Sequence, residues 1–147
     1  MTNTPADLIR RTDEIREHFP HYWRDEQAQA ELAAIWGEAI NPQGVFVDHP
    51  NEVLYDRDGC KASISIGTAK GVFAFGCSYQ TPTQGYGSAP SIWDDLFGSY
   101  SDARAAAIEF LLARLPTPEG QHEVSERVRI DRMRNAIAAP LRQPSLF

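Results

Sequence analysis

The sequence has few cysteines, few basic residues and no long apolar run, and each absence excludes a class of protein. Two cysteines in 147 residues are too few for a small secreted domain built on several disulfides. Lysine and arginine total 14 against 20 aspartates and glutamates, a net charge of −6. This balance disfavours direct DNA or RNA binding over a broad face, because phosphates require a basic surface. No apolar run approaches the length of a membrane-spanning helix.

The first residues lack the features of a secretory signal. Residues 1–7 carry neither a basic leader nor an apolar stretch, so we expect a cytoplasmic protein with no membrane partner and no direct nucleic-acid partner. The chain is 42% hydrophobic and 23% charged, which is ordinary for a folded domain with a sizeable core.

Motifs for metal binding and catalysis are also missing. The four histidines, at positions 18, 21, 49 and 122, have no cysteines or carboxylates beside them at zinc-site spacing. The sequence contains no P-loop, no dinucleotide fingerprint and no Gly-x-Ser-x-Gly motif. It therefore predicts no metal, no cofactor, no catalytic residue and no enzymatic activity, and leaves a small enzyme of unrecognised type as an alternative.

The remaining pattern places helices at both ends and strands in the middle. Thr4 and Pro5 are typical of a helix start, and apolar residues then recur at helical spacing. We expect helices over residues 5–19, 25–40, 103–115 and 121–138, and short strands over 45–47, 53–55, 60–66, 72–79 and 91–93. The sequence thus predicts an α+β domain over residues 1–139, with a small antiparallel sheet packed on one face by N- and C-terminal helices.

Two central strands alternate clearly enough to suggest a register. Residues 60–66 and 72–79 alternate apolar and small or polar side chains, and residues 67–70 form the expected connection. A symmetric hairpin pairs Ile64 with Phe73 and Cys60 with Cys77, and a slip by one residue would break the match of faces. We expect the cysteines to be neighbouring buried thiols rather than a disulfide.

A long segment over residues 80–98 follows the hairpin. It contains two prolines, three glycines and the aromatic residues Tyr86, Trp93 and Phe97. Long loops inside compact domains are often functional, and aromatic side chains anchor many protein interfaces. We expect this segment to form a recognition surface for another protein. The alternative is that its aromatic residues cover the open face of the sheet.

The last five residues of the sequence are Gln143, Pro144, Ser145, Leu146 and Phe147. This string resembles the pentapeptide, commonly Gln-Leu-Ser/Asp-Leu-Phe, with which bacterial polymerases and repair proteins dock on the DNA sliding clamp. Pro144 replaces the usual leucine. The resemblance implies that Gln143 enters a polar subsite and that Leu146 and Phe147 fill an apolar cleft. Pro140 and Pro144 predict that residues 140–147 leave the preceding helix as a tail.

Together these features predict a non-enzymatic adapter or regulator. It docks on the sliding clamp through its tail and affects replication or repair, by recruitment or by inhibition. The alternative is a plasmid- or phage-type interaction module that blocks a host defence or regulatory protein. In that case Leu146 and Phe147 pack against their own subunit or against a second copy in a homodimer. The sequence does not identify a partner for the globular body.

Overall fold

Four α-helices and a four-stranded antiparallel sheet form the protein in a computed structural model that describes residues 3–142. The element order is α1 (Pro5–His18), α2 (Glu26–Trp36), β1 (Asn51–Arg57), β2 (Cys60–Ala69), β3 (Val72–Gln80), β4 (Gly85–Gly87), α3 (Tyr100–Arg114) and α4 (Val124–Arg142). The strands lie in the order β1-β2-β3-β4. The predicted α+β class, with helices from both ends of the chain, is confirmed.

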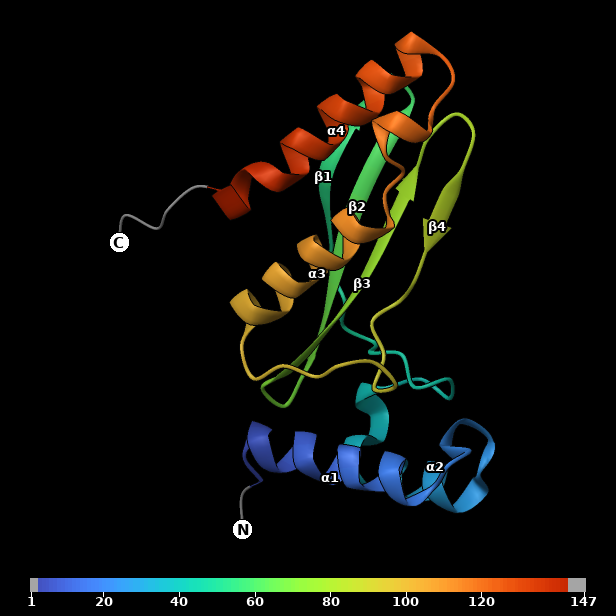
Figure 1. Ribbon diagram of the computed structural model, residues 1–147. Helices are drawn as coiled ribbons and strands as arrows, with labels where there is room; N and C mark the ends of the chain where they lie inside the picture. Colours follow the sequence, from blue (N-terminus) through green and yellow to red (C-terminus); the bar gives the residue numbers. More distant parts are fainter. Residues whose placement is uncertain (1–2, 143–147) are drawn as a thin grey trace, which may run out of the picture.

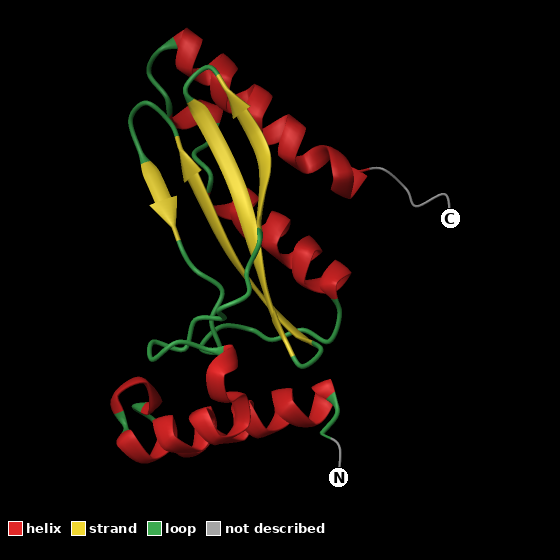
Figure 2. Ribbon diagram, turned by 180° about the vertical axis from the view of Figure 1, so that it is seen from behind, coloured by secondary structure: helices red, strands yellow, loops and turns green. Residues whose placement is uncertain are grey.

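The two helix pairs occupy different places on the sheet. α3 and α4 cover one face, whereas α1 and α2 form a layer beneath one end of the sheet (Figure 1). Seen from behind, the other face of the sheet carries none of the helices formed by residues 3–142 (Figure 2). The expectation that both pairs share one face is therefore wrong. The N-terminal helices instead pack on loops and on the end of the β2–β3 hairpin. These segments present a second apolar surface, separate from the one under α3 and α4.

Two hydrophobic cores result from this arrangement. The first lies between the sheet and α3 and α4, and contains Ile64, Ile66, Leu111 and Met133 among its buried members. The second joins the N-terminal layer to the sheet, and its buried members are Leu8, Leu32, Ile35, Trp36, Phe46, Val72, Ala74 and Ile92. β3 serves both cores because successive side chains of a strand point to opposite faces.

Phe46 lies at the joint between the layers. It is fully buried, its ring meets that of Trp36 edge-on at 5.6 Å, and a Cβ on Gly67 would lie 2.7 Å from its own Cβ. The strands expected over 45–47 and 91–93 are wrong, since this region forms only the isolated bridges Ile40–Phe46 and Val45–Ser91. Side-chain packing and isolated backbone hydrogen bonds, such as those from Phe46 N to the Pro90 carbonyl and from Val47 N to the Ala39 carbonyl, therefore hold this segment in place of a strand ladder.

Two-residue turns set the register of the hairpins. Asp58 and Gly59 join β1 to β2, Lys70 and Gly71 join β2 to β3, and all four have φ between 54° and 79°. Such pairs suit the type I′ turn, whose twist matches that of the strands. Because the second turn lies at 70–71, Ile64 faces Cys77 rather than Phe73. The predicted pairing is shifted from the observed one by an even number of residues. Each side chain therefore still points to the face of the sheet that was predicted for it.

The corrected register separates the two cysteines. Cys77 faces Ile64 and Cys60 faces Arg57, so the expectation that the cysteines are cross-strand neighbours is wrong. Both are free thiols and only 1% and 2% exposed in the core under α3 and α4. Burial is the main cause that raises the pKa of each thiol, as expected when the thiolate is disfavoured by an apolar environment.

Both thiols should therefore resist labelling in the native protein. With Ellman's reagent at pH 8, Cys60 and Cys77 should react only after denaturant is added, because their reactive thiolates are rare and covered. A Ser101→Cys variant supplies the control, since this exposed position of α3 should label at once. Fast native labelling of Cys60 and Cys77 would contradict the described core.

An ion pair ties the edge strand β1 to α3. Arg104 Nε and Nη2 donate to Glu52 Oε1 and Oε2 at 3.0 and 2.7 Å. Hydrogen bonds from this guanidinium lower the pKa of the Glu52 carboxyl. A carboxyl whose pKa is lower in the folded state contributes stability above its unfolded pKa, and that contribution disappears as pH falls through the folded value.

Glu52→Gln should accordingly lower the free energy of unfolding at pH 7 by about 0.5–1 kcal/mol. The figure is small because the two side chains are 39% and 31% exposed and water screens the pair. The difference from wild type should shrink as pH falls below the usual glutamate pKa and disappear as pH falls through the lower folded-state pKa of Glu52. Urea unfolding from pH 7 into this acidic range measures it, with exposed Glu119→Gln as control. A difference that stays constant as pH falls would contradict the electrostatic cause.

The last helix extends further than the sequence suggests. α4 runs to Arg142 and includes Pro140, so the predicted end at residue 138 is wrong. Proline has no backbone N–H, so the Ala136 carbonyl receives no hydrogen bond from residue 140. The energetic cost of this missing bond is smaller in the last turn than in a helix interior. Within residues 3–142, no helix combines the length and the apolar character required to cross a bilayer.

Candidate functional site

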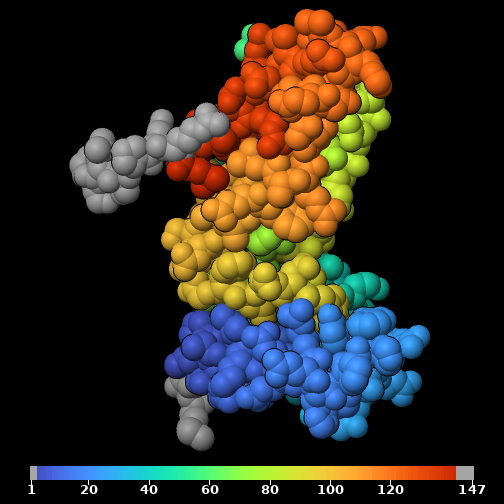
Figure 3. All heavy atoms as spheres, in the orientation of Figure 1, coloured from blue at the N-terminus to red at the C-terminus, as the bar shows by residue number. Residues whose placement is uncertain are grey.

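A cleft of about 290 Å³ lies where the N-terminal layer meets the sheet. We call it the interlayer groove. Its lining residues are Arg16, Phe75, Tyr86, Ser88, Trp93, Asp94, Asp95 and Phe110. They come from α1, β3, β4, α3 and the segment that follows β4. Figure 3 shows the yellow part of that segment directly above the blue N-terminal helices.

One group of lining residues is an aromatic cluster on β3, β4 and α3. The ring of Phe110 lies 5.5 Å from Phe75 and 6.4 Å from Tyr86. Tyr86 faces Tyr79 across the β3–β4 ladder and stacks on it at 6.3 Å, which places Tyr86 on the side of the sheet that α3 covers. The alternative that Tyr86 covers the open face is therefore wrong. Arg114 lies over the rings of Tyr86 and Phe110, at 4.8 and 5.0 Å.

Trp93 lines another part of the groove, and several residues contact its side chain. Its Nε1 donates to the Gln43 carbonyl at 2.7 Å, and its ring stacks on Tyr22 at 5.0 Å. Gly44 has φ +83°, and a Cβ there would lie 2.6 Å from Trp93 Nε1. Glycine at position 44 thus permits both the turn and the close approach of the indole. These contacts fix the orientation of Trp93.

Charged residues complete the groove beside Trp93. Arg16 donates from Nη1 to the Asp94 carbonyl at 3.1 Å, lies 3.7 Å from the Asp13 carboxylate, and sits over the Tyr22 ring. The Asp94 carboxylate accepts from Ser91 Oγ at 3.1 Å. The Asp95 carboxylate is exposed and makes no hydrogen bond or ion pair with any residue in the described range. It is therefore available to an external partner.

The structure brings together two of the three aromatic residues predicted for recognition. Tyr86 and Trp93 line the groove, whereas Phe97 does not; its backbone pairs with Phe73 in both directions, and its ring lies 6.1 Å from that of the lining residue Phe75. Tyr86 and Trp93 also pack against the two cores. Replacing both by alanine should therefore also weaken the fold.

The sequence pattern missed Arg16 and Phe110. Arg16 lies on α1 and Phe110 on α3, both outside residues 80–98, and each looks like an ordinary helical residue. No local signal marks them, because only the packing of α1 and α3 against β3 and β4 brings them to the groove.

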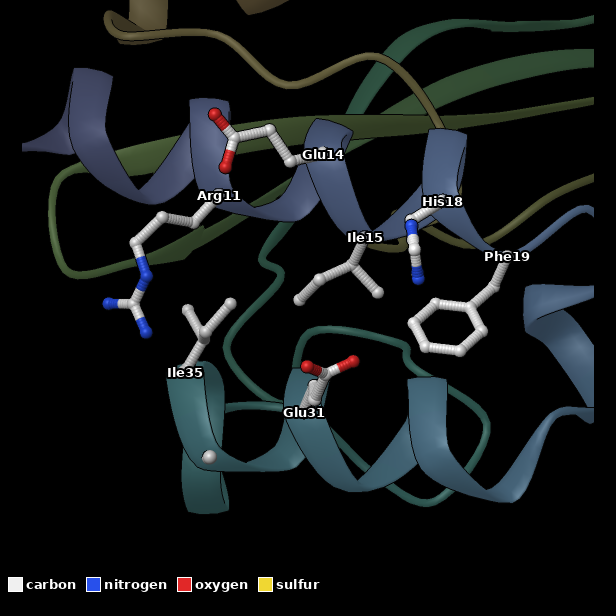
Figure 4. A pocket seen from close by; sticks show the side chains of 8 residues that line it. Arg11, Glu14, Ile15, His18, Phe19, Glu31 and Ile35 are labelled. Carbon is white, nitrogen blue, oxygen red and sulfur yellow. The ribbon is translucent and has the colours of Figure 1, made fainter.

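A second cleft, of about 460 Å³, separates α1 from α2. Ile15 of α1 and Phe19, the residue after α1, face Glu31 and Ile35 of α2 across it, and Glu14 also lines it (Figure 4). His18 also lines this cleft and meets the Phe19 ring edge-on at 4.8 Å. In the described part of the chain, no three His, Cys, Asp or Glu residues are grouped to hold a metal ion. The cleft is a crevice between two helices.

Comparison of the chain with known protein families, curated proteins and solved structures finds no match. The function must therefore be inferred from the residues themselves. Of the predicted site residues, Gln143, Pro144, Ser145, Leu146 and Phe147 lie outside the described residues.

Proposed function

We propose that the protein is a non-enzymatic adapter or regulator that docks on the bacterial DNA sliding clamp through residues 143–147. The observation that carries this proposal is the likeness of Gln143, Ser145, Leu146 and Phe147 to the clamp-binding pentapeptide, at four of five positions. These residues follow directly after α4, and Leu141 in its last turn is 41% exposed. A partner can thus approach the chain at this end of α4. Such a protein would act in the cytoplasm, where the clamp works.

The expected affinity is modest. Each of two apolar side chains entering a preformed cleft contributes roughly 1.5–3 kcal/mol, and Pro144 limits the conformational freedom that binding removes. The favourable burial of the two side chains, less the cost of ordering the tail, corresponds to micromolar dissociation constants. Since other clamp ligands use the same cleft, docking would compete with polymerases. The protein could then inhibit replication, or bring a second protein to the clamp through the interlayer groove.

The direct test compares two chains for binding to purified clamp by calorimetry. The full-length protein should bind with a micromolar dissociation constant, and a chain that ends at Arg142 should not bind. Matching urea unfolding curves for the two chains establish that the truncation leaves the body folded. Equal binding by the two chains, or no binding by the full-length protein at high micromolar clamp, would reject the proposal.

The interlayer groove supports a second candidate function. A plasmid- or phage-type interaction module that blocks a host protein would use the fixed Trp93 indole and the unpaired Asp95 carboxylate, without the tail. A chain that ends at Arg142 distinguishes the two candidates. It should keep its partner if the body alone recognises that partner, and it should lose the clamp if the tail is the docking element.

A further inference from the structure

We infer that the interlayer groove receives a single cationic side chain, a guanidinium or an ammonium group, from an exposed segment of a partner protein. The inference rests on the proposed function only in treating the groove as the recognition surface of the body. It does not require the clamp or residues 143–147.

The charged side chains of the groove favour a cation at Asp95. The lining includes two carboxylates, Asp94 and Asp95, and one guanidinium, that of Arg16; a second guanidinium, that of Arg114, is already held over the Tyr86 and Phe110 rings. Arg16 already interacts with Asp13, with the Asp94 carbonyl and with the Tyr22 ring. Its positive charge is therefore offset within the protein, whereas Asp95 has no partner among the described residues. A cationic ligand can pair with Asp95 without displacing an existing contact, and charge-assisted hydrogen bonds are the stronger ones.

The aromatic lining of the groove also favours a cation. Cations are attracted to the faces of aromatic rings, and tryptophan offers the most favourable ring. The groove contains Trp93 beside the two carboxylates, whereas the Tyr86 ring already stacks on Tyr79 and carries Arg114. The protein already uses this chemistry next to the groove, where Arg114 lies 4.8 Å from the Tyr86 ring centroid. Because Gln43, Tyr22 and Gly44 fix the indole, little conformational freedom is lost on binding.

The size of the groove limits what it can receive. A volume of about 290 Å³ lies at the lower limit of the range for small-molecule pockets. It suits one long side chain rather than a folded element or a nucleotide. The net charge of −6 would also steer a basic partner toward the protein.

The test uses the full chain, labelled with nitrogen-15, and a short peptide as probe. Acetyl-Gly-Arg-Gly-amide should shift the Trp93 indole signal and the Asp95 amide signal in a saturable manner, with a millimolar dissociation constant. The Trp93 signal is assigned by its loss in Trp93→Phe. The matching citrulline peptide has nearly the same shape but no charge, and it should bind at least about threefold more weakly.

Two aspartate variants separate local recognition from overall charge. Asp95→Asn should weaken arginine-peptide binding by roughly threefold or more. Asp48→Asn removes an exposed carboxylate that does not line the groove, and it should leave the affinity unchanged. Equal losses in the two variants, equal binding of citrulline, or no saturable shift at tens of millimolar peptide would overturn the inference. A chain that ends at Arg142 should bind the peptide as the full chain does, so failure here is distinguishable from failure of clamp docking.

Discussion

Changing both Leu146 and Phe147 to alanine should reduce the affinity of the full-length protein for a bacterial sliding clamp by more than about a hundredfold. Binding energy in protein interfaces is concentrated in a few buried anchors, and these are the two apolar side chains of the pentapeptide. Removing them forfeits on the order of 3 kcal/mol or more of apolar burial. With a micromolar starting affinity, binding would fall below detection in most assays.

Two other changes in the tail should keep binding. Pro144→Leu should preserve or improve the affinity because leucine is the usual residue at that position of the clamp-binding pentapeptide that residues 143–147 resemble. Ser145→Asp should be tolerated, since serine and aspartate both occupy that position of the pentapeptide. Fluorescence polarisation with peptides of residues 141–147 measures all of these variants under the same conditions. Unchanged affinity in the double-alanine peptide would exclude Leu146 and Phe147 as anchors.

Phe46→Ala should lower the free energy of unfolding by about 3–5 kcal/mol. Phe46 is fully buried where the N-terminal layer meets the sheet, against the Trp36 ring and the backbone of Gly67. Alanine would leave a large cavity, and the Gly67 backbone cannot collapse into it without breaking the β2–β3 ladder. The loss would be a large fraction of the total stability of a domain of this size.

Neighbouring substitutions make this prediction specific. Phe46→Leu keeps most of the volume and should cost less than the alanine variant. Val47→Ala is the matched control, because Val47 is 64% exposed and its truncation should change stability by less than about 0.5 kcal/mol. Guanidinium unfolding provides the comparison. A loss below about 1 kcal/mol for Phe46→Ala would contradict the joint described between the two layers.

Local chemistry by itself determined several elements of the fold. Thr4 and Asp7 form a capping box at the start of α1, with Pro5 in the first turn, and this pattern is readable because all partners lie within four residues. The Asp58-Gly59 turn is equally local, since both residues tolerate the positive φ that the hairpin needs. The alternation along β2 correctly predicted which of its side chains enter the core.

The register of the β2–β3 hairpin depended on more than the alternation. Every even shift places the same residues on the same face, so the pattern alone cannot choose among such shifts. The choice came from the Lys70-Gly71 turn and from the packing around it. On the face away from α3 and α4, Phe46 approaches Gly67 and Pro5 lies beside Gly71. These contacts join residues from distant parts of the chain, and no local pattern contains them.

The interlayer groove was decided by the tertiary structure alone. The sequence predicted that Tyr86 and Trp93 belong to a recognition segment, because aromatic residues stand out in a long loop rich in glycine and proline. It did not predict that Arg16 would lie beside Asp94, or that Phe110 would lie beside Tyr86. The apolar face of a helix can pack against many surfaces, so the sequence of α1 or α3 does not specify its partner. Only the joint burial of both cores selects one arrangement, and that arrangement leaves the Asp95 carboxylate without a partner in the described chain.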